Sequence, residues 1–247
     1  MALQTDKVLA GFAVNCMESP DFCPLAHRFE LASDLQAGII AFLQALKSRP
    51  INIPGIGPVD YSTAKSTILT DLYGDWMGLA TQLDQSMEAM NVQNSHAATN
   101  WKRDMYTQPI DIKRRDDVAH LIPEVWESLA GIHCSDRTNR ATSLNQLKPG
   151  ILASWSLGYM ADYNDVTTLE CAQWKFDAKE RYNGNFSTKP ANPVLLVGNT
   201  FDPVTPLASA YNVSSSFVDS VVLEHNGYGV SFFFFFFFFF VCVCLCE

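Results

Sequence analysis

The sequence predicts an α/β fold in which a helical first half is followed by a strand–helix–strand unit. In the first half, apolar residues recur every three or four positions over 35–46 and 76–91, which is typical of amphipathic helices. Near the other end, residues 193–198 form a short apolar run that contains two Val and closes with Gly, and a second such run follows at 220–224. Short β-branched runs bounded by turn residues indicate buried strands of a parallel sheet.

The helices of the first half are bounded by capping and breaking signals. Ser33 and Gln36 have the spacing of a capping box, so we expect the first helix to begin at Ser33. It should end at Arg49, because the residue before Pro50 avoids the helical conformation. No strand is expected in this half. The elements expected after Pro50 are an irregular loop at 50–60, helices at 62–73 and 76–91, a long loop at 92–117, and a helix interrupted by Pro123 at 117–130.

The C-terminal unit is expected to run as strand, loop, helix, strand and turn. Thr205 followed by Pro206 suits a helix N-cap and first helical position. Catalytic groups of open α/β sheets lie at the carboxyl ends of the strands, which singles out Asp202 and the turn Gly227–Gly229. The expected elements are a strand at 193–198, a loop at 199–203, a helix from 205 to about 217, a strand at 220–224 and a turn at 226–229.

Composition and charge exclude several classes of function. The 247 residues include 17 Lys and Arg against 26 Asp and Glu, for a net charge of −9. A nucleic-acid binder would need a basic face, so we expect no nucleic-acid partner. Hydrophobic residues make up 48% and charged residues 17% of the chain, which argues against disorder. The sequence contains no phosphate loop, internal repeat or metal-ligand cluster, and we expect no cofactor.

The tail differs from the rest of the chain. Residues 230–246 are uncharged and almost wholly apolar, and they include nine consecutive Phe and an alternating Val-Cys run. Seventeen residues is the lower limit for a membrane-spanning helix, yet no Lys or Arg flanks the segment. We favour translated simple-sequence DNA, because a T-rich tract encodes Phe and a GT repeat encodes Val-Cys. The same argument disfavours a metal site at Cys242, Cys244 and Cys246.

Six segments of the chain resemble one family. The run Val194–Pro206, with Asn-Thr-Phe-Asp-Pro at its centre, resembles the acid-bearing segment of tripeptidyl-aminopeptidase-like α/β-hydrolases, which are secreted serine exopeptidases of bacteria and fungi. Residues 220–223 followed by Gly227-Tyr228-Gly229 resemble the last strand and the next turn of that family. The weaker matches are 131–136, 171–174, 16–23 and 72–76, so that the resemblance covers most of residues 10–229.

The resemblance implies a helical lid region followed by the closing βαβ part of an α/β-hydrolase sheet. The implied divisions are a lid at 1–125, a C-terminal core part at 126–229 and the low-complexity tail at 230–247. Asp202 would be the acid of a Ser-His-Asp triad, holding the His in one tautomer; the alternative is an Asp-Pro turn that only ends a strand. A peptide would be the substrate. The family also implies disulfides Cys16–Cys23 and Cys134–Cys171, with buried free thiols as the alternative.

Two triad members do not occur in this sequence. There is no Gly-x-Ser-x-Gly, and the nearest run, Gly229–Phe233, lacks the final Gly and follows the acid. The family's His comes directly after the Gly-x-Gly turn, where this chain has Val230. We expect His225 to be an exposed residue at the end of a strand and not a substitute. We therefore predict an inactive fragment of a serine exopeptidase.

Two further classes of function stay open. One is a non-enzymatic binding protein built from the lid, and the other is a protein anchored in a membrane by residues 230–246. The resembled family is secreted, but residues 1–11 lack the long apolar stretch and cleavage site of a signal peptide, so the localisation of this chain stays open. The oligomeric state is also not predicted.

Overall fold

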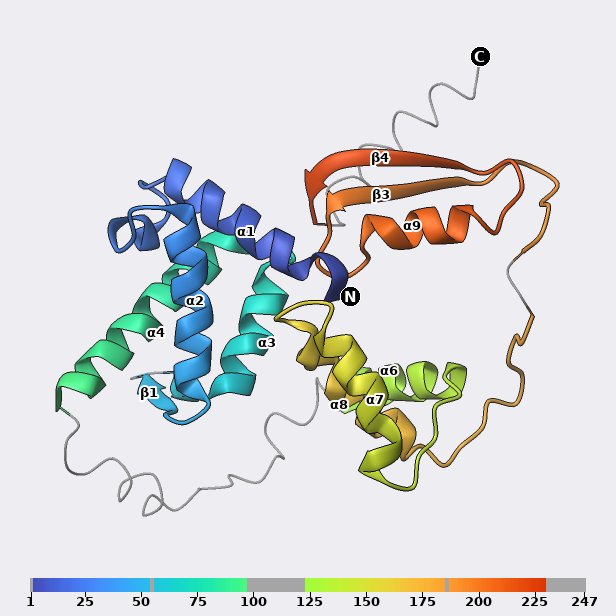
Figure 1. Cartoon of the computed structure of the whole chain (residues 1–247), viewed down its shortest axis with the longest axis horizontal. Helices are drawn as coiled ribbons and strands as arrows, with labels where there is room; N and C mark the ends of the chain where they lie inside the picture. The colour runs from blue at the N-terminus through green and yellow to red at the C-terminus, as the bar shows by residue number, and fades with distance from the viewer. Residues whose placement is uncertain (1, 54–55, 97–122, 185–186, 230–247) are drawn as a thin grey trace.

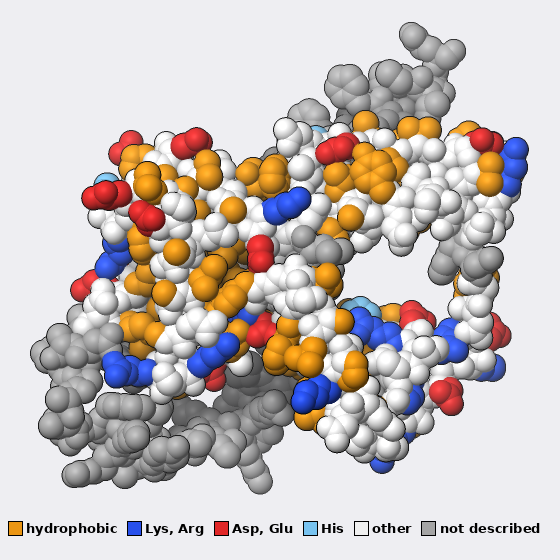
Figure 2. All heavy atoms as spheres, viewed as in Figure 1, with side chains coloured by type: hydrophobic (Ala, Val, Ile, Leu, Met, Phe, Trp, Pro, Cys, Tyr) orange, Lys and Arg blue, Asp and Glu red, His pale blue; other side chains and the backbone are white. Residues whose placement is uncertain are grey.

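The computed structural model describes residues 2–53, 56–96, 123–184 and 187–229, which form three groups of elements (Figure 1). Four helices and a short hairpin make the N-terminal helical group, three α-helices make the central helical group, and a strand–helix–strand unit follows. Residues 1, 54–55, 97–122, 185–186 and 230–247 lie outside the described residues and are drawn in grey in Figure 2. Within the described part, no helix is long and apolar enough to cross a membrane.

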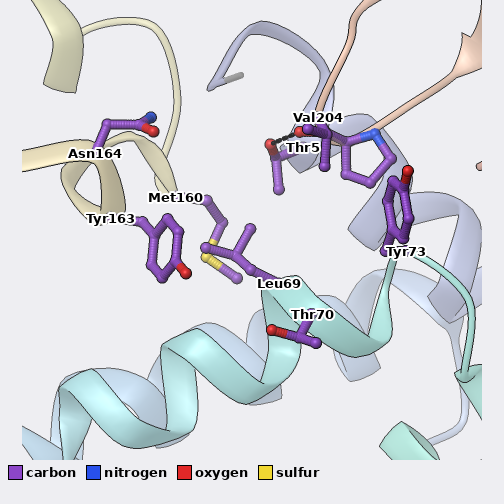
Figure 3. Close-up of a pocket in the computed structure, with 9 residues that line it drawn as sticks. Thr5, Leu69, Thr70, Tyr73, Met160, Tyr163, Asn164 and Val204 are labelled. Carbon is purple, nitrogen blue, oxygen red and sulfur yellow. Dashed lines mark hydrogen bonds between the residues drawn. The ribbon is translucent and has the colours of Figure 1, made fainter. Parts of the chain in front are cut away.

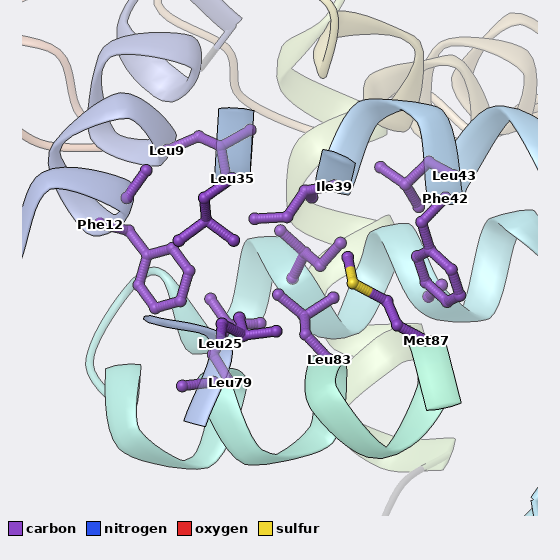
Figure 4. Packing of buried hydrophobic residues seen from close by; sticks show 14 of the residues in the cluster. Leu9, Phe12, Leu25, Leu35, Ile39, Phe42, Leu43, Leu79, Leu83 and Met87 are labelled. Atoms are coloured by element: carbon purple, nitrogen blue, oxygen red, sulfur yellow. The ribbon is translucent and has the colours of Figure 1, made fainter. Parts of the chain in front are cut away.

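The N-terminal helical group holds the main hydrophobic core. It consists of α1 (Ala2–Glu18), a 3₁₀ turn at Pro24–His27, α2 (Ala32–Leu46), α3 (Tyr61–Asp71) and α4 (Trp76–His96). Leu35, Ile39 and Leu43 are fully buried, at the spacing of one helix face. Figure 4 shows them meeting residues of α1 and α4, including Phe12 and Leu83. The helical stripes predicted from the sequence thus form this core.

Three expectations for this half are wrong. Asp34 and Leu35 donate their N–H groups to the Leu31 carbonyl at 3.0 Å, so α2 begins before Ser33, whose side chain forms no cap. Residues expected as a loop form an antiparallel hairpin of β1 (Ile51–Ile53) and β2 (Gly57–Val59), because their alternate apolar side chains are buried. Helix α4 runs on to His96, into residues that were expected to begin a long loop. The helix expected at 117–130 lies partly outside the described residues, in which α6 spans Pro123–Asp136.

Only the first helix of the central helical group was expected from the sequence, as part of the helix at 117–130. The group contains α6, α7 (Leu144–Trp155), a 3₁₀ turn at Ala161–Asn164 and α8 (Asp165–Ala172). A disulfide between Cys134 and Cys171 joins α6 to α8, and both residues have 0% exposure. A second disulfide, Cys16–Cys23, closes the end of α1 onto the loop that follows it. Both expected pairings are therefore present, and the alternative of free thiols is wrong.

The strand–helix–strand unit is the expected βαβ unit. It consists of β3 (Leu195–Phe201), α9 (Leu207–Ser214) and β4 (Val221–Tyr228), and the two strands are parallel. Both strands are longer than predicted: residues 199–201 continue β3, and residues 225–228 continue β4. Pairing of the two strands provides hydrogen-bond partners for the backbone N–H and C=O groups of these residues. This gain outweighs the preference of Asn and Gly for turns. The helix begins one residue later than expected, with Pro206 as its N-cap.

The two faces of this small sheet differ in cover. Helix α9 packs on one face, where a Cβ on Gly198 would lie 2.8 Å from Leu207 Cδ1. On the other face, near the carboxyl ends of the strands, Phe201 stacks on Tyr228 with ring centroids 4.6 Å apart, and Tyr228 meets Trp76 of α4 at 4.7 Å. At the amino end of β3, Leu195 is 49% exposed. The prediction of a buried strand is therefore wrong, because no other strand of the described chain pairs with β3 or β4.

Candidate functional site

Asp202 lies directly after β3, at the carboxyl end of the parallel pair. Its residue exposure is only 2%. The end of the neighbouring strand β4 lies beside Asp202. The next residue, Gly229, donates its N–H to the carbonyl of Phe201 at 3.0 Å. Gly229 has φ +75°, a left-handed conformation that glycine adopts without strain. The acid and the glycine turn singled out from the sequence are therefore adjacent in space.

Three hydrogen bonds from Val204 and Thr205 hold the carboxylate of Asp202. Oδ1 accepts the N–H groups of Val204 and Thr205 at 2.8 and 2.7 Å, and Oδ2 accepts the Thr205 hydroxyl at 2.6 Å. Hydrogen bonds of this kind offset the cost of burying a charged group. They also fix the orientation of the carboxylate. We call residues 202–206 the acid loop.

His225 lies within β4 and not at the end of a strand. It is half-buried, and its Nδ1 lies 3.0 Å from Oδ1 of Asn199. Asn199 pairs with His225 across the ladder, three positions before the acid. The expectation of an exposed strand-end His is therefore wrong, because the pairing of β3 with β4 continues past it.

Helix α1 anchors the acid loop to the N-terminal helical group. The Thr5 hydroxyl donates to the Pro203 carbonyl at 3.2 Å, and the Leu207 N–H donates to Oε1 of Gln4 at 3.3 Å. Thr5 is only 2% exposed, so the first of these contacts is shielded from water. The position of the loop thus depends on α1 as well as on β3.

A pocket of about 250 Å³ lies between the acid loop and the two helical groups (Figure 3). Pro203 and Val204 of the acid loop form one wall, together with Thr5. Leu69, Thr70 and Tyr73 contribute from α3 and the residues after it, and Met160, Tyr163 and Asn164 contribute from the 3₁₀ turn and the residue before it. The pocket therefore exists only where all three parts of the chain meet.

A buried charge network holds the 3₁₀ turn in place. The ammonium of Lys65, a residue 2% exposed, donates to the Tyr159 carbonyl at 2.8 Å, to the Tyr61 hydroxyl at 2.7 Å and to the Asp162 carboxylate. Tyr61 donates to the other Asp162 oxygen at 2.6 Å, and the Tyr159 N–H donates to Asp6 at 2.8 Å. Burial lowers the pKa of Lys65 and raises the pKa of Tyr61. The network joins α1 and α3 to one wall of the pocket.

Comparison with known proteins supports the α/β-hydrolase interpretation. Residues 159–234 match a family described as TAP-like protein. The match covers less than a third of the chain, and it supports an α/β-hydrolase TAP-like domain in that part. Neither the curated proteins nor the solved structures contain a match to this chain. In the described residues, no group of three or more His, Cys, Asp or Glu could hold a metal ion.

Sequence reasoning singled out Asp202 but missed the contacts around it. Thr205 was expected to cap α9, yet its hydroxyl and N–H bind Asp202 instead. The signal was present, because an Asp followed three residues later by Thr suits a local side-chain-to-backbone turn. Tyr163 and Asn164 of the pocket gave no comparable signal, since their contribution depends on how the central helical group packs.

Proposed function

We propose that this chain supplies the lid and the triad acid of a tripeptidyl-aminopeptidase-like serine exopeptidase, with Asp202 as that acid. The observation that carries the proposal is the carboxylate of Asp202, a residue only 2% exposed, directly after β3 and beside the turn at Gly229. The TAP-like match includes this whole segment. The two disulfides are typical of proteins that fold in an oxidising compartment, which supports secretion.

The proposed role of Asp202 is electrostatic. A triad acid holds the imidazole in one tautomer and stabilises the imidazolium that forms when serine is deprotonated. Asp202 suits that role because three local hydrogen bonds fix its carboxylate. An ionised carboxylate accepts about four hydrogen bonds, so one acceptor site is left for an imidazole N–H.

By itself, the chain is proposed to be inactive towards peptides. The sequence has no Gly-x-Ser-x-Gly nucleophile segment, and Val230 follows Gly229 where the family has His. Serine attack and proton transfer need those two side chains. The purified chain should show no labelling by a fluorophosphonate probe. Labelling that disappears on Asp202→Ala would overturn the proposed inactivity.

A graft tests the role of the acid. Residues 187–229 would replace the equivalent segment of an active TAP-like hydrolase that retains its own Ser and His. Asp202→Asn in the graft should lower kcat by about 10⁴-fold, since the amide favours the wrong imidazole tautomer. Asp219→Asn is the control: Asp219 is exposed and has φ 64°, which Asn tolerates. Equal activity of the two variants, both with the melting temperature of the graft, would refute the role of Asp202.

A further inference from the structure

We propose that the pocket between the acid loop and the helical groups binds one uncharged apolar side chain of the peptide substrate. The inference extends the proposed function, because it names the kind of residue that the enzyme would accept beside the triad acid. It rests on the lining of the pocket, its volume and its position.

The lining has no charged side chain, and the polar groups of Thr5, Thr70 and Asn164 donate hydrogen bonds within the protein. The Thr5 hydroxyl is bound to the Pro203 carbonyl at 3.2 Å, and the Thr70 hydroxyl to the Ser66 carbonyl at 2.9 Å. The amide nitrogen of Asn164 donates to the carbonyl of Ala161. A charged side chain that entered would lose its hydration without gaining an ionic partner. An apolar side chain loses nothing of that kind and gains contact with the apolar walls.

The apolar contacts come from opposite sides of the pocket. Leu69 and Met160 lie near its centre, between the rings of Tyr163 and Tyr73 (Figure 3). Tyr73 and Tyr163 are 39% and 37% exposed, so both rings reach the surface of the protein. A pocket with aromatic rings at its rim and a buried thioether inside suits a flexible or flat apolar group.

The volume sets the size of that group. An apolar cavity of about 150 Å³ accommodates benzene. The 250 Å³ of this pocket therefore accommodate a Phe or Leu side chain but not a whole tripeptide. One residue of the substrate would enter, while its backbone stays outside.

The position links the pocket to the acid. Val204 lines the pocket and donates its N–H to the Asp202 carboxylate at 2.8 Å. On the other side, the Tyr73 carbonyl lies 3.1 Å from where a Cβ on Gly229 would be, so the pocket also borders the glycine turn. A peptide with one side chain in the pocket would thus lie beside the acid and the turn.

Calorimetric titration of the full chain with N-acetyl amino-acid amides tests the proposal. The Phe and Leu amides should bind, and the Asp and Lys amides should bind at least about tenfold more weakly, which corresponds to about 1.4 kcal/mol. Leu69→Trp should weaken binding of the Phe amide by a similar factor, because the indole fills the pocket. Leu152→Trp is the matched control on α7, where Leu152 is 49% exposed; binding should stay within about twofold of wild type.

Tyr163→Ala gives a second measurement if Leu69→Trp does not fold. This variant removes a partly exposed ring from the rim and should weaken binding of the Phe amide without changing the melting temperature by more than a few degrees. Binding of no amide, equal binding of the Asp and Phe amides, or unchanged binding in both pocket variants would overturn the proposal. If the graft shows that Asp202 is dispensable while these variants lose binding, the pocket stands and the role of the acid fails.

Discussion

The two disulfides should stabilise the chain by different amounts, and the structure allows the difference to be calculated. Cys134–Cys171 closes a sequence separation of 37 residues, whereas Cys16–Cys23 closes one of 7. In the chain-entropy treatment, a cross-link stabilises by restricting the unfolded chain, and the effect grows with the logarithm of the loop length. This gives about 3.8 kcal/mol for the longer loop and about 2.4 kcal/mol for the shorter one at 25 °C.

Removing each disulfide in turn isolates the effect of loop length, because the two disulfides are buried to a similar extent. All four cysteines are 5% exposed or less. Replacing either pair by Ala therefore removes the same two buried sulfur atoms, and the cavity costs should be similar. The double variant C134A/C171A should lose about 1.4 kcal/mol more free energy of unfolding than C16A/C23A.

Urea unfolding followed by circular dichroism measures both losses. The m-values of the two variants must agree with each other within error, since a changed slope would signal a change in the unfolded state. Fully reduced wild-type protein is the control, and it should be less stable than either double variant. If C16A/C23A loses as much stability as C134A/C171A or more, the loop-length reasoning is refuted.

Three further predictions concern the buried network and the packing of glycines. Burial, helped by its hydrogen bond to Asp162, raises the pKa of Tyr61 above its usual 10.0. The stability this gives is complete below pH 10 and lost above it, so unfolding titrations should fall more steeply above pH 10 for wild type than for Tyr61→Phe. Asp162→Ala leaves the Lys65 ammonium buried and should cost about 3 kcal/mol, whereas Lys65→Met should cost about 1 kcal/mol; equal losses in denaturant unfolding would contradict this. Gly131→Ala, with no atom within 4 Å of the new Cβ, should raise the stability of α6 by roughly 0.5–1 kcal/mol. Gly198→Ala should lower stability, because its Cβ would lie 2.8 Å from Leu207; thermal melts with shifts of the same sign would refute that pair.

Patterns that lie within one segment were predicted well. The apolar positions of α2 follow a single helix face, so Leu35, Ile39 and Leu43 could be placed in the core from their spacing. The apolar runs around Val197 and Val222 predicted two parallel strands, because the helical segment between them has the length of a βαβ connection. The position of Asp202 followed from the end of the first run.

Features decided by contacts between distant segments could not be predicted. The hairpin at 51–59 has Pro and Gly signals that favour a loop, but its alternate residues are buried against the helical group. Whether β3 ends at Gly198 or Phe201 depends on the pairing of each residue with β4, which the sequence does not encode locally. Lysine is normally a surface residue. The burial of Lys65 depends on its contact with Asp162, almost a hundred residues later in the sequence.

The contacts of α1 explain how the acid loop can be well ordered on a sheet of only two described strands. A parallel sheet is normally stabilised by helices on both faces, yet here one face of β3 is open at Leu195 and Val197. The first turns of α1 supply the missing support, because Gln4 and Thr5 bind the backbone on either side of Thr205. Trp76 adds a second anchor by packing on Tyr228 at the end of β4. The helical group therefore does more than cover the site: it fixes the backbone that carries Asp202, so changes in α1 should alter the acid loop before they alter the strands.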